Sequence, residues 1–459
     1  MRWFGAPAAM PLARPRALLG ARQEGREVDR LAWPIITDGL FQTALDLTNL
    51  ALLGRIGTAA LSGVGAATQL IQLGVSALAA VSVGGMVLVA QARGARDERG
   101  AGRIAGQALL LSLAIGVLLA IPAGLYPAPL LRAIGATPEV ADQGAIYLRL
   151  AAAVFPAFAL LQVAAAIMRG AGNSRTPMFV NILTNAINVA LAATLIYGPP
   201  RLGVAGAAWG AAVARTLGAI LLVWVLWRSG ELRGARLQLE RALLRRLVGI
   251  GLPSMGEQVI LSLGLLAYGY LTLRLGTTLY AAQRVCLTLI GVAWMPAFGY
   301  GQAATALVGQ AIGGADATRA RVLARAGAGR AIAWMTGIAV LGFIFAEPLV
   351  GLFTADPSVR SASATGLRVL CLAQPMWGLG QVYAGSLRGT GDTRYPMVAT
   401  AAGVWLVRMP VAYLCAFTFG FGLPGIFVSN GVDATVCAAL VTRRFLQGKW
   451  RKRVVERGA

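Results

Sequence analysis

The chain contains 459 residues, of which 57% are hydrophobic and only 13% are charged, a composition too apolar for a soluble domain of this size. Its formal charge of +23 could indicate a nucleic-acid partner, but the positions of the basic residues, given below, argue against one. Histidine is absent, which removes the commonest general base and the commonest metal ligand.

Apolar runs of about twenty residues recur along the chain and predict membrane-spanning segments. Backbone groups in lipid must be hydrogen-bonded internally, and the runs lack the alternation of barrel strands, so the spans are expected to be helices. The twelve predicted spans are 31–53, 59–92, 104–125, 143–168, 177–197, 203–227, 247–272, 278–312, 327–346, 362–387, 397–418 and 424–446.

The segments between and beyond these spans are polar. Residues 1–30 carry six arginines and no signal-peptide pattern, so they are predicted to be a poorly ordered cytoplasmic tail. The Arg-rich segment 228–246 is predicted to be a cytoplasmic linker, which could lie on the membrane surface as an interfacial helix. It is long enough to let the two halves of the chain move relative to each other. Residues 447–459 form a second basic tail.

An internal repeat divides the chain into two units, 31–227 and 247–446. The stretches 168–178 and 387–397 share the pattern R-G-x-G-x-x-R-x-P-M at an offset of 219 (388 − 169). The same offset relates Pro34 to Pro253 and Gln91 to Gln310 without a gap. Each unit has six predicted spans, an even number, so both units enter the membrane from the same side as parallel repeats.

Basic residues orient the chain. Of the 41 arginines and lysines, 31 lie in the two tails and in the loops on one side of the predicted spans. The positive-inside rule places that side, with both termini, in the cytoplasm. The charge therefore indicates topology and attraction to anionic lipid, not nucleic-acid binding. In the R-G-x-G turns, glycine permits the tight turn, arginine is predicted to anchor at headgroups, and proline opens the next helix.

Several short motifs, in order within this duplicated frame, resemble the multidrug and toxic compound extrusion (MATE) transporters. They are L-A-W-P at 31–34, L-G-R-I-G at 53–57, V-A-Q-A-R-G at 89–94, its echo V-G-Q-A-I-G at 308–313, both R-G-x-G turns, and G-V-A-G at 203–206.

This resemblance implies an all-α integral membrane protein whose two six-helix lobes form a V around a central cavity. It implies a bacterial inner-membrane antiporter, not an enzyme, that uses H⁺ or Na⁺ and no other cofactor to export an organic cation by alternating access. Its partners would be a small-molecule substrate and membrane lipid, and it would act as a monomer.

Ionisable residues inside a membrane cost about 2.5–3.5 kcal/mol each at mid-bilayer on insertion scales, so they are candidates for function. Asp38 and Asp46 in span one lie two turns apart on one helix face, with Gln42 between them and Asn49 one turn on. They could form a ladder that binds H⁺ or Na⁺, or they could be helix-packing groups, with Asp38 near the headgroups.

Glu257 in span seven occupies the position equivalent to Asp38 in the second unit. An acid at the same place in both halves favours a role in cation coupling, including a possible Na⁺ site at Asp46 or Glu257. The alternative is a structural ion pair between Glu257 and Arg284 of span eight. Such a pair could also act as a switch when the acid is protonated.

Other polar residues are candidates for lining the cavity. Asn181, Asn185 and Asn188 form one face of span five, where amides could coordinate Na⁺, orient a carboxyl group or join helices. The chain departs from the resembled family in having Asn49 and Ala192 where acids are common. Arg408 and Asp433, in the last two spans, could pair with each other.

Arg284 gives a reason to consider other cargoes, because a fixed positive charge would repel a cationic drug. The alternatives are an exporter of an anionic or zwitterionic metabolite and a flippase for lipid-linked precursors. A membrane enzyme is disfavoured by the missing catalytic motifs, and a passive channel by the buried acids. The aromatic residues Trp33, Trp294, Trp377 and Tyr300 could line the cavity or anchor the helices.

Overall fold

The computed structural model describes residues 15–54, 57–199, 201–236 and 238–451, and these residues form an all-helical protein. The first half contains α1 (Pro15–Gly54), α2 (Thr58–Gly94), α3 (Glu98–Leu125), α4 (Pro127–Ala133), α5 (Pro138–Gly170), α6 (Arg175–Tyr197) and α7 (Val204–Arg228). The second half begins with α8 (Arg241–Leu273), α9 (Thr277–Ala293), α10 (Met295–Gly313), α11 (Ala317–Ile344), α12 (Ala346–Gly351) and α13 (Pro357–Gly389). It ends with α14 (Arg394–Ala402), the π-helix Gly403–Arg408, α15 (Met409–Tyr413), the π-helix Leu414–Thr418, α16 (Gly422–Leu446) and the 3₁₀ turn Lys449–Arg451.

Helices long and apolar enough to cross a membrane number nine in the described part of the chain, or ten if α9 and α10 together make one span. The twelve predicted spans exceed this count because α1 and α13, although 40 and 33 residues long, do not meet the same test of apolarity. In α1, the polar residues Asp38, Gln42, Asp46 and Asn49 lower the hydropathy.

The predicted span 278–312 is broken. α9 and α10 meet at an angle of 43°, and Pro296 lies in the first turn of α10. A proline in the first turn opens a helix but cannot continue the previous one, because it has no amide hydrogen to donate. The equivalent position of the first half is Ala77, and α2 runs through it as one helix.

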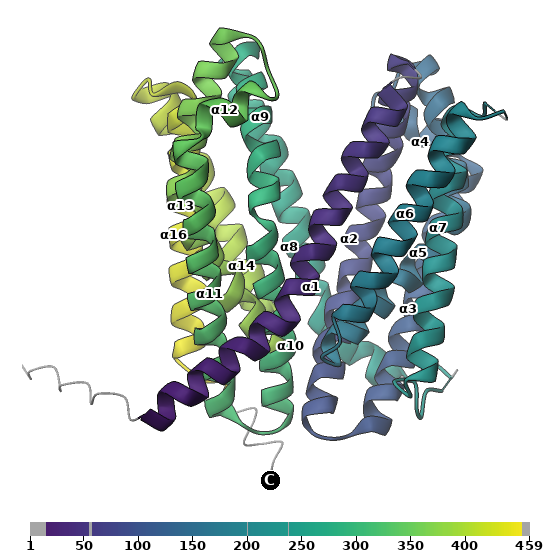
Figure 1. The fold of residues 1–459 in the computed structure, drawn as a ribbon, viewed down its shortest axis with the longest axis vertical. Coiled ribbons are helices and arrows are strands. Elements are labelled where there is room, and N and C mark those ends of the chain that lie inside the picture. Colours follow the sequence, from purple (N-terminus) through teal and green to yellow (C-terminus); the bar gives the residue numbers. More distant parts are fainter. Residues whose placement is uncertain (1–14, 55–56, 200, 237, 452–459) are drawn as a thin grey trace, which may run out of the picture.

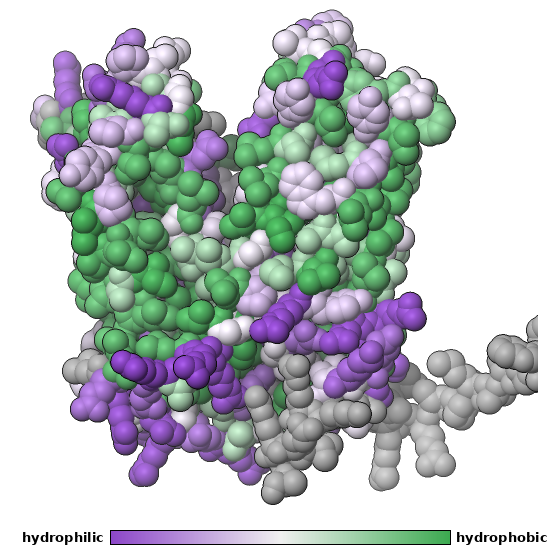
Figure 2. All heavy atoms as spheres, turned by 180° about the vertical axis from the view of Figure 1, so that it is seen from behind, coloured by the Kyte–Doolittle hydropathy of each residue, from purple (hydrophilic) through white to green (hydrophobic). Residues whose placement is uncertain are grey.

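The helices form two groups that lie together at one end and diverge toward the other, giving a V (Figure 1). The space-filling view shows the hollow between the arms of the V (Figure 2). Hydrophilic side chains gather at the joined end, which holds the α2–α3 and α10–α11 turns and the end of α16; we call it the basic end. The short helices α4 and α12 lie at the opposite, divergent end.

α1 and α8 cross from one half to the other. The early part of α1 packs on α10 and α11 of the second half, and its later part packs on α6 of the first (Figure 1). α8 does the reverse, packing on α2 and on α14. The prediction of a poorly ordered tail up to residue 30 is therefore wrong from Pro15 onward, and residues 1–14 lie outside the described part.

Polar contacts hold the start of α1 against the second half. Arg319 donates hydrogen bonds of 2.8 and 3.0 Å to the Glu27 carboxylate, and Tyr300 donates one of 2.9 Å to Asp29, which also pairs with Arg330. Tyr300 is fully buried in this contact, so the prediction that it could line a cavity is wrong.

The linker between the halves is fixed by α2 and α3. Gln107 donates to the carbonyl oxygens of Arg236 and Gln238 and accepts from the amide of Glu240 at 3.0 Å. Arg93 of α2 pairs with Glu231 of the linker. Of the predicted linker 228–246, residues 229–236 and 238–240 form turns and irregular segments, while residues 241–246 already belong to α8.

The repeat is visible in backbone detail. Gly172 and Gly391, at equivalent places in the R-G-x-G turns, have φ values of 94° and 88°, a region that glycine enters without strain. Asp97 and Asp316, also equivalent, cap the starts of α3 and α11, and each accepts a backbone hydrogen bond of 2.8 Å. The turns between helices are therefore duplicated along with the spans.

Candidate functional site

Asp38 forms a buried polar triad in the first half. The residue is 8% exposed, on the part of α1 that has crossed into its own half. Arg169, in the last turn of α5, approaches its carboxylate to 2.9 Å, and Asn181 of α6 donates to both carboxylate oxygens at 3.0 Å. Burying a charge is costly unless it is paired and hydrogen-bonded, and this carboxylate has both kinds of partner.

Glu257 forms the matching triad in the second half. It is 7% exposed on α8, with Arg388 of α13 at 2.8 Å from both carboxylate oxygens and the Thr400 hydroxyl donating at 3.2 Å. All three members lie 219 residues after those of the first triad (257 − 38, 388 − 169, 400 − 181). The duplicated unit therefore carries one acid–arginine–polar triad in each half.

The arginines of these triads correct two interpretations made from the sequence. Glu257 pairs with Arg388, so the alternative in which it pairs with Arg284 is wrong. Arg169 and Arg388 do not extend to headgroups, since their side chains are only 17% and 18% exposed. The second arginines of the two motifs, Arg175 and Arg394, are exposed as an anchor would be. The repeat offset was the available signal, because it joins two buried acids to two equally spaced arginines.

The residue after each triad arginine takes part in a contact between the halves. The carbonyl of Gly170 accepts a hydrogen bond of 2.9 Å from Gln310 of α10, and the carbonyl of Gly389 accepts one of 3.0 Å from Gln91 of α2. These bonds are again equivalent under the repeat. Arg169 itself donates across the halves, at 3.3 Å, to Gln302 of α10.

Two glycines allow α2 and α10 to approach closely beside these bonds. A Cβ atom added at Gly94 would lie 1.8 Å from the carbonyl oxygen of Gln310, and one added at Gly313 would lie 1.9 Å from that of Gln91. Real side chains do not tolerate such distances, so the helices touch only because both residues lack a side chain. The V is therefore closed at the basic end by paired glycine contacts and paired glutamine bonds.

Asp46 differs from Asp38. It is exposed on α1 and accepts a hydrogen bond of 3.3 Å from Gln42, one turn earlier. Asn49 is half-buried one turn further along. Span one thus carries a buried acid near the closed end and an exposed acid about 12 Å along the helix, eight residues later.

The asparagine face of α6 continues from the first triad. Asn181 binds Asp38, while the Asn185 Nδ2 and the Asn188 Oδ1 are buried without a hydrogen-bond partner in the described structure. No group of three acidic or cysteine side chains is gathered for a metal ion among the described residues. An Na⁺ ion here would need one carboxylate together with amide or carbonyl oxygens, the ligands that hard cations accept.

The predicted pairing of Arg408 with Asp433 is confirmed. The Arg408 Nε lies 2.9 Å from the Asp433 carboxylate, and both side chains are almost fully buried, between α16 and the π-helix Gly403–Arg408. A Cβ atom at Gly403 would meet Asp433, so the π-helix packs directly on this pair. Cys437 donates a weak hydrogen bond to the same carboxylate at 3.2 Å. Neither member of the pair has a charged equivalent in the first half.

Arg284 is exposed on α9 and forms no ion pair with any described residue. Trp294 and Trp377 stack on each other, with ring centroids 4.5 Å apart, and Trp33 packs edge-on against Trp334. Each of the indole rings of Trp33, Trp294 and Trp377 therefore already packs against another aromatic side chain on one face or edge.

Comparison with known proteins gives consistent matches. A family model described as MatE matches residues 34–194 and 253–414, one segment in each half. The chain is 30% identical over 435 residues to a probable multidrug resistance protein NorM of Thermotoga maritima, covering 94% of each chain. It is 31% identical over 434 residues to the multidrug resistance protein NorM of Burkholderia vietnamiensis, covering 91% of this chain and 92% of that one.

Among solved structures, the chain resembles one described as the outward-facing conformation of a multidrug resistance MATE family transporter of the MOP superfamily. The TM-score is 0.86 at 22% identity, and the match covers 94% of this chain and 96% of the other. This likeness concerns the fold.

Proposed function

The chain belongs to the multidrug and toxic compound extrusion family of membrane transporters, and we propose that it exports organic molecules by antiport with H⁺ or Na⁺. It is a transporter and not an enzyme. The proposal places the basic end in the cytoplasm of a bacterium, in the inner membrane, with both termini on that side. The V is then open outward, and the contacts at the basic end form the closed inner gate.

One observation carries the coupling proposal: each half buries an acid–arginine triad directly beside a carbonyl that bonds to the other half. Asp38 holds Arg169, and the next residue, Gly170, is bonded to Gln310. Glu257 holds Arg388, and Gly389 is bonded to Gln91. A change of charge at either acid is therefore transmitted to the gate through a single peptide unit.

The cycle follows from this geometry. A proton or Na⁺ ion that enters from outside neutralises the carboxylate and weakens its hold on the arginine. The end of α5 or α13 then shifts, the glutamine bond is lost, and the lobes rock to open the gate inward. After the cation is released into the cytoplasm, cargo binds from that side, and re-formation of the ion pair closes the gate with the cargo now facing outward. Asp46, with Gln42 and Asn49, lies along the route on α1 and is proposed to take the cation first.

The energetic scale is adequate for export. A tenfold gradient of the coupling ion supplies about 1.4 kcal/mol and can sustain about a tenfold gradient of a singly charged cation exchanged one for one, an exchange that moves no net charge. Where a net charge enters, a membrane potential adds about 2.3 kcal/mol per charge per 100 mV. A ligand can shift a conformational equilibrium only by its difference in affinity between the two states. Here that difference arises because the acid is paired with arginine in the closed-gate state and not in the open one.

Substitution of the acids tests this coupling. We expect Asp38→Asn, Asp46→Asn and Glu257→Gln each to reduce gradient-driven ethidium efflux from proteoliposomes toward the passive leak, losing most of the roughly tenfold dye gradient that a tenfold ion gradient can sustain. The pH and Na⁺ gradients should be imposed separately, which identifies the coupling ion. Asp142→Asn, an exposed acid on α5, is the control. Undiminished efflux by the three variants, singly and together, would refute the coupling role.

The charge of the cargo is a separate proposal. We favour an organic cation, but the exposed, unpaired Arg284 supports a second candidate, the export of an anionic or zwitterionic metabolite or the flipping of a lipid-linked precursor. Arg284→Gln is expected to increase efflux of cationic dyes if the cargo passes this residue as a cation, since it removes a repulsive charge. It is expected to reduce transport of anions if they are the true cargo.

These outcomes are separated by measuring ethidium and an anionic dye in parallel. The exposed Arg360, at the divergent end, gives a control variant, Arg360→Gln. An Arg284 variant with unchanged rates for both dyes would show that this residue has no influence on cargo selection. Loss of lipid-linked precursor flipping on depletion of the protein would support the flippase alternative.

A further inference from the structure

A groove runs along the outer side of the second half, away from the triads. It has a volume of about 630 Å³ and lies between α13 and α16. Both helices are at the edge of the protein, where lipid would surround it (Figure 1). The walls are mainly apolar and include Met376 and Leu379 of α13 and Ala438 and Ala439 of α16.

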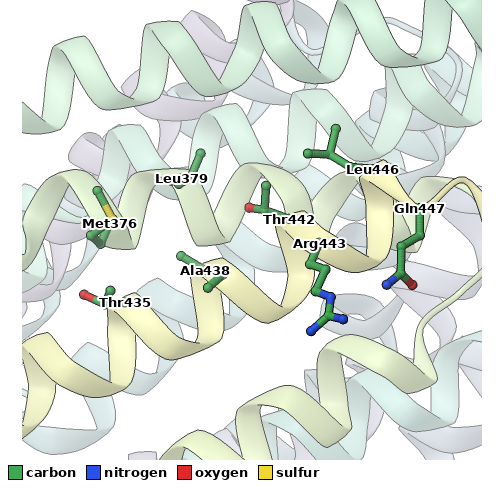
Figure 3. Close-up of a pocket in the computed structure, with 9 residues that line it drawn as sticks. Met376, Leu379, Thr435, Ala438, Thr442, Arg443, Leu446 and Gln447 are labelled. Atoms are coloured by element: carbon green, nitrogen blue, oxygen red, sulfur yellow. The ribbon is translucent and has the colours of Figure 1, made fainter. Parts of the chain in front are cut away.

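The two ends of the groove differ in chemistry. Figure 3 shows Met376 and Thr435 toward one end and Arg443 and Gln447 toward the other. From Thr435 to Gln447 is twelve helical residues, or about 18 Å, slightly more than half of the roughly 30 Å hydrocarbon core. The groove therefore reaches from the interior of one leaflet to its headgroup level at the basic end.

Arg443 carries the charge at this end. It is exposed and makes no ion pair with any described residue. Its neighbour Arg444 is committed to Asp392, with two hydrogen bonds of 3.1 and 3.0 Å. A cation of this kind at headgroup level, above an apolar channel, complements an anionic headgroup with an attached acyl chain.

The first half supplies an internal comparison. By the repeat offset, Ala439 corresponds to Ile220 and Arg443 corresponds to Trp224. In the first half, the exposed Ile220 is larger than alanine, and the guanidinium of Arg228 lies over the Trp224 ring at 5.3 Å. The small side chain and the free arginine that make the groove are thus particular to the second half.

We propose that this groove binds one anionic glycerophospholipid of the leaflet at the basic end. Arg443 holds the phosphate, Gln447 contributes a polar contact, and one acyl chain lies along Ala438 and Ala439 toward Met376. Gln447 is exposed beside Arg443, and its amide can donate to a phosphate or glycerol oxygen.

The test is native mass spectrometry of the full chain titrated with phosphatidylglycerol or with phosphatidylethanolamine. We expect one phosphatidylglycerol to be retained more tightly than phosphatidylethanolamine by about fivefold, the value of one basic residue near the surface. Arg443→Gln should abolish that preference. Ala439→Ile, which copies the first half, should fill the groove and weaken retention of both lipids.

Arg228→Gln, a basic residue at the same level of the first half, should behave as the wild type. Dye efflux by all variants in phosphatidylglycerol liposomes checks that they are folded, and lipid binding is read independently of the coupling mechanism. Equal retention of the two lipids by the wild type, or an unchanged preference in Arg443→Gln and Ala439→Ile, would overturn the proposal.

Discussion

Arg388→Leu is expected to lower the free energy of unfolding of the purified protein by about 3–5 kcal/mol, because it leaves the buried Glu257 carboxylate without its counter-charge. Glu257→Gln should have a cost of the same kind, since it leaves the Arg388 guanidinium unpaired. The double variant is expected to recover most of the loss, because replacing both members of a buried pair is close to neutral. Melting curves in detergent, followed by a thiol-reactive or light-scattering signal, measure these differences.

The same set of variants separates stability from transport. All three should fail to use the ion gradient, including the double variant whose stability is restored. Glu257→Gln and the double variant have no titratable acid at this site, and Arg388→Leu keeps Glu257 but removes the arginine that the acid must hold and release. Asp38 and Arg169 provide the equivalent set in the first half, and Arg360→Gln provides an exposed control. A double variant as unstable as the single variants would mean that the two residues do not act as a pair. Restored coupling in the double variant would show that the pair is structural only.

The fold could be predicted largely from the sequence, because its main determinants are local or periodic. Apolar runs predict helices, and the offset of 219 predicts the duplication that the Gly172 and Gly391 turns reproduce. The break at Pro296 was missed because the apolar run continues through it, and apolarity alone does not report where a helix is interrupted. The early start of α1 was missed because its charged side chains are neutralised by partners far away in the chain, such as Arg319 for Glu27.

The candidate site was only partly predictable. Asp38 and Glu257 stand out as charges in apolar runs, and Arg408 and Asp433 could be matched because they lie in the last two spans. Arg169 and Arg388 were assigned to headgroups because they sit in a turn motif at a span end, where arginine usually serves as an anchor. What decides their role is the place where α1 and α8 cross from one half to the other. That crossing depends on tertiary packing and has no signature in the local sequence.

Gly94→Val is expected to prevent the outward-open state from forming. A Cβ atom there would lie 1.8 Å from the Gln310 carbonyl oxygen, so α2 and α10 would have to separate at the basic end. Backbone atoms cannot move aside as a flexible side chain could. A gate that cannot close should leave the protein inward-open and inactive, and moving a two-state equilibrium from 1:99 to 99:1 takes only about 5.5 kcal/mol. Gly65→Val is the matched control on the same helix, since a Cβ atom at Gly65 meets nothing within 4 Å.

Removing the glutamine bonds gives a graded version of the same perturbation. Gln91→Ala combined with Gln310→Ala removes two bonds between the halves, each with a net contribution of about 0.5–1.5 kcal/mol. The ratio of outward-open to inward-open protein should then fall by about fivefold to 160-fold. The separation of the lobes can be measured by double electron–electron resonance spectroscopy between spin labels at Arg99 and Thr318. These two positions beside the gate are exposed and equivalent under the repeat.

We expect the short distance between these labels to dominate in the wild type and in Gly65→Val. A longer distance should grow in the glutamine double variant and dominate in Gly94→Val. Because the two perturbations act on one gate, Gly94→Val should leave little further effect for the glutamine substitutions to add, as expected for coupled neighbours. Distances identical to the wild type in both would show that the lobes separate elsewhere. The triads would then have to act on the cargo cavity directly, without passing through Gly170 and Gly389.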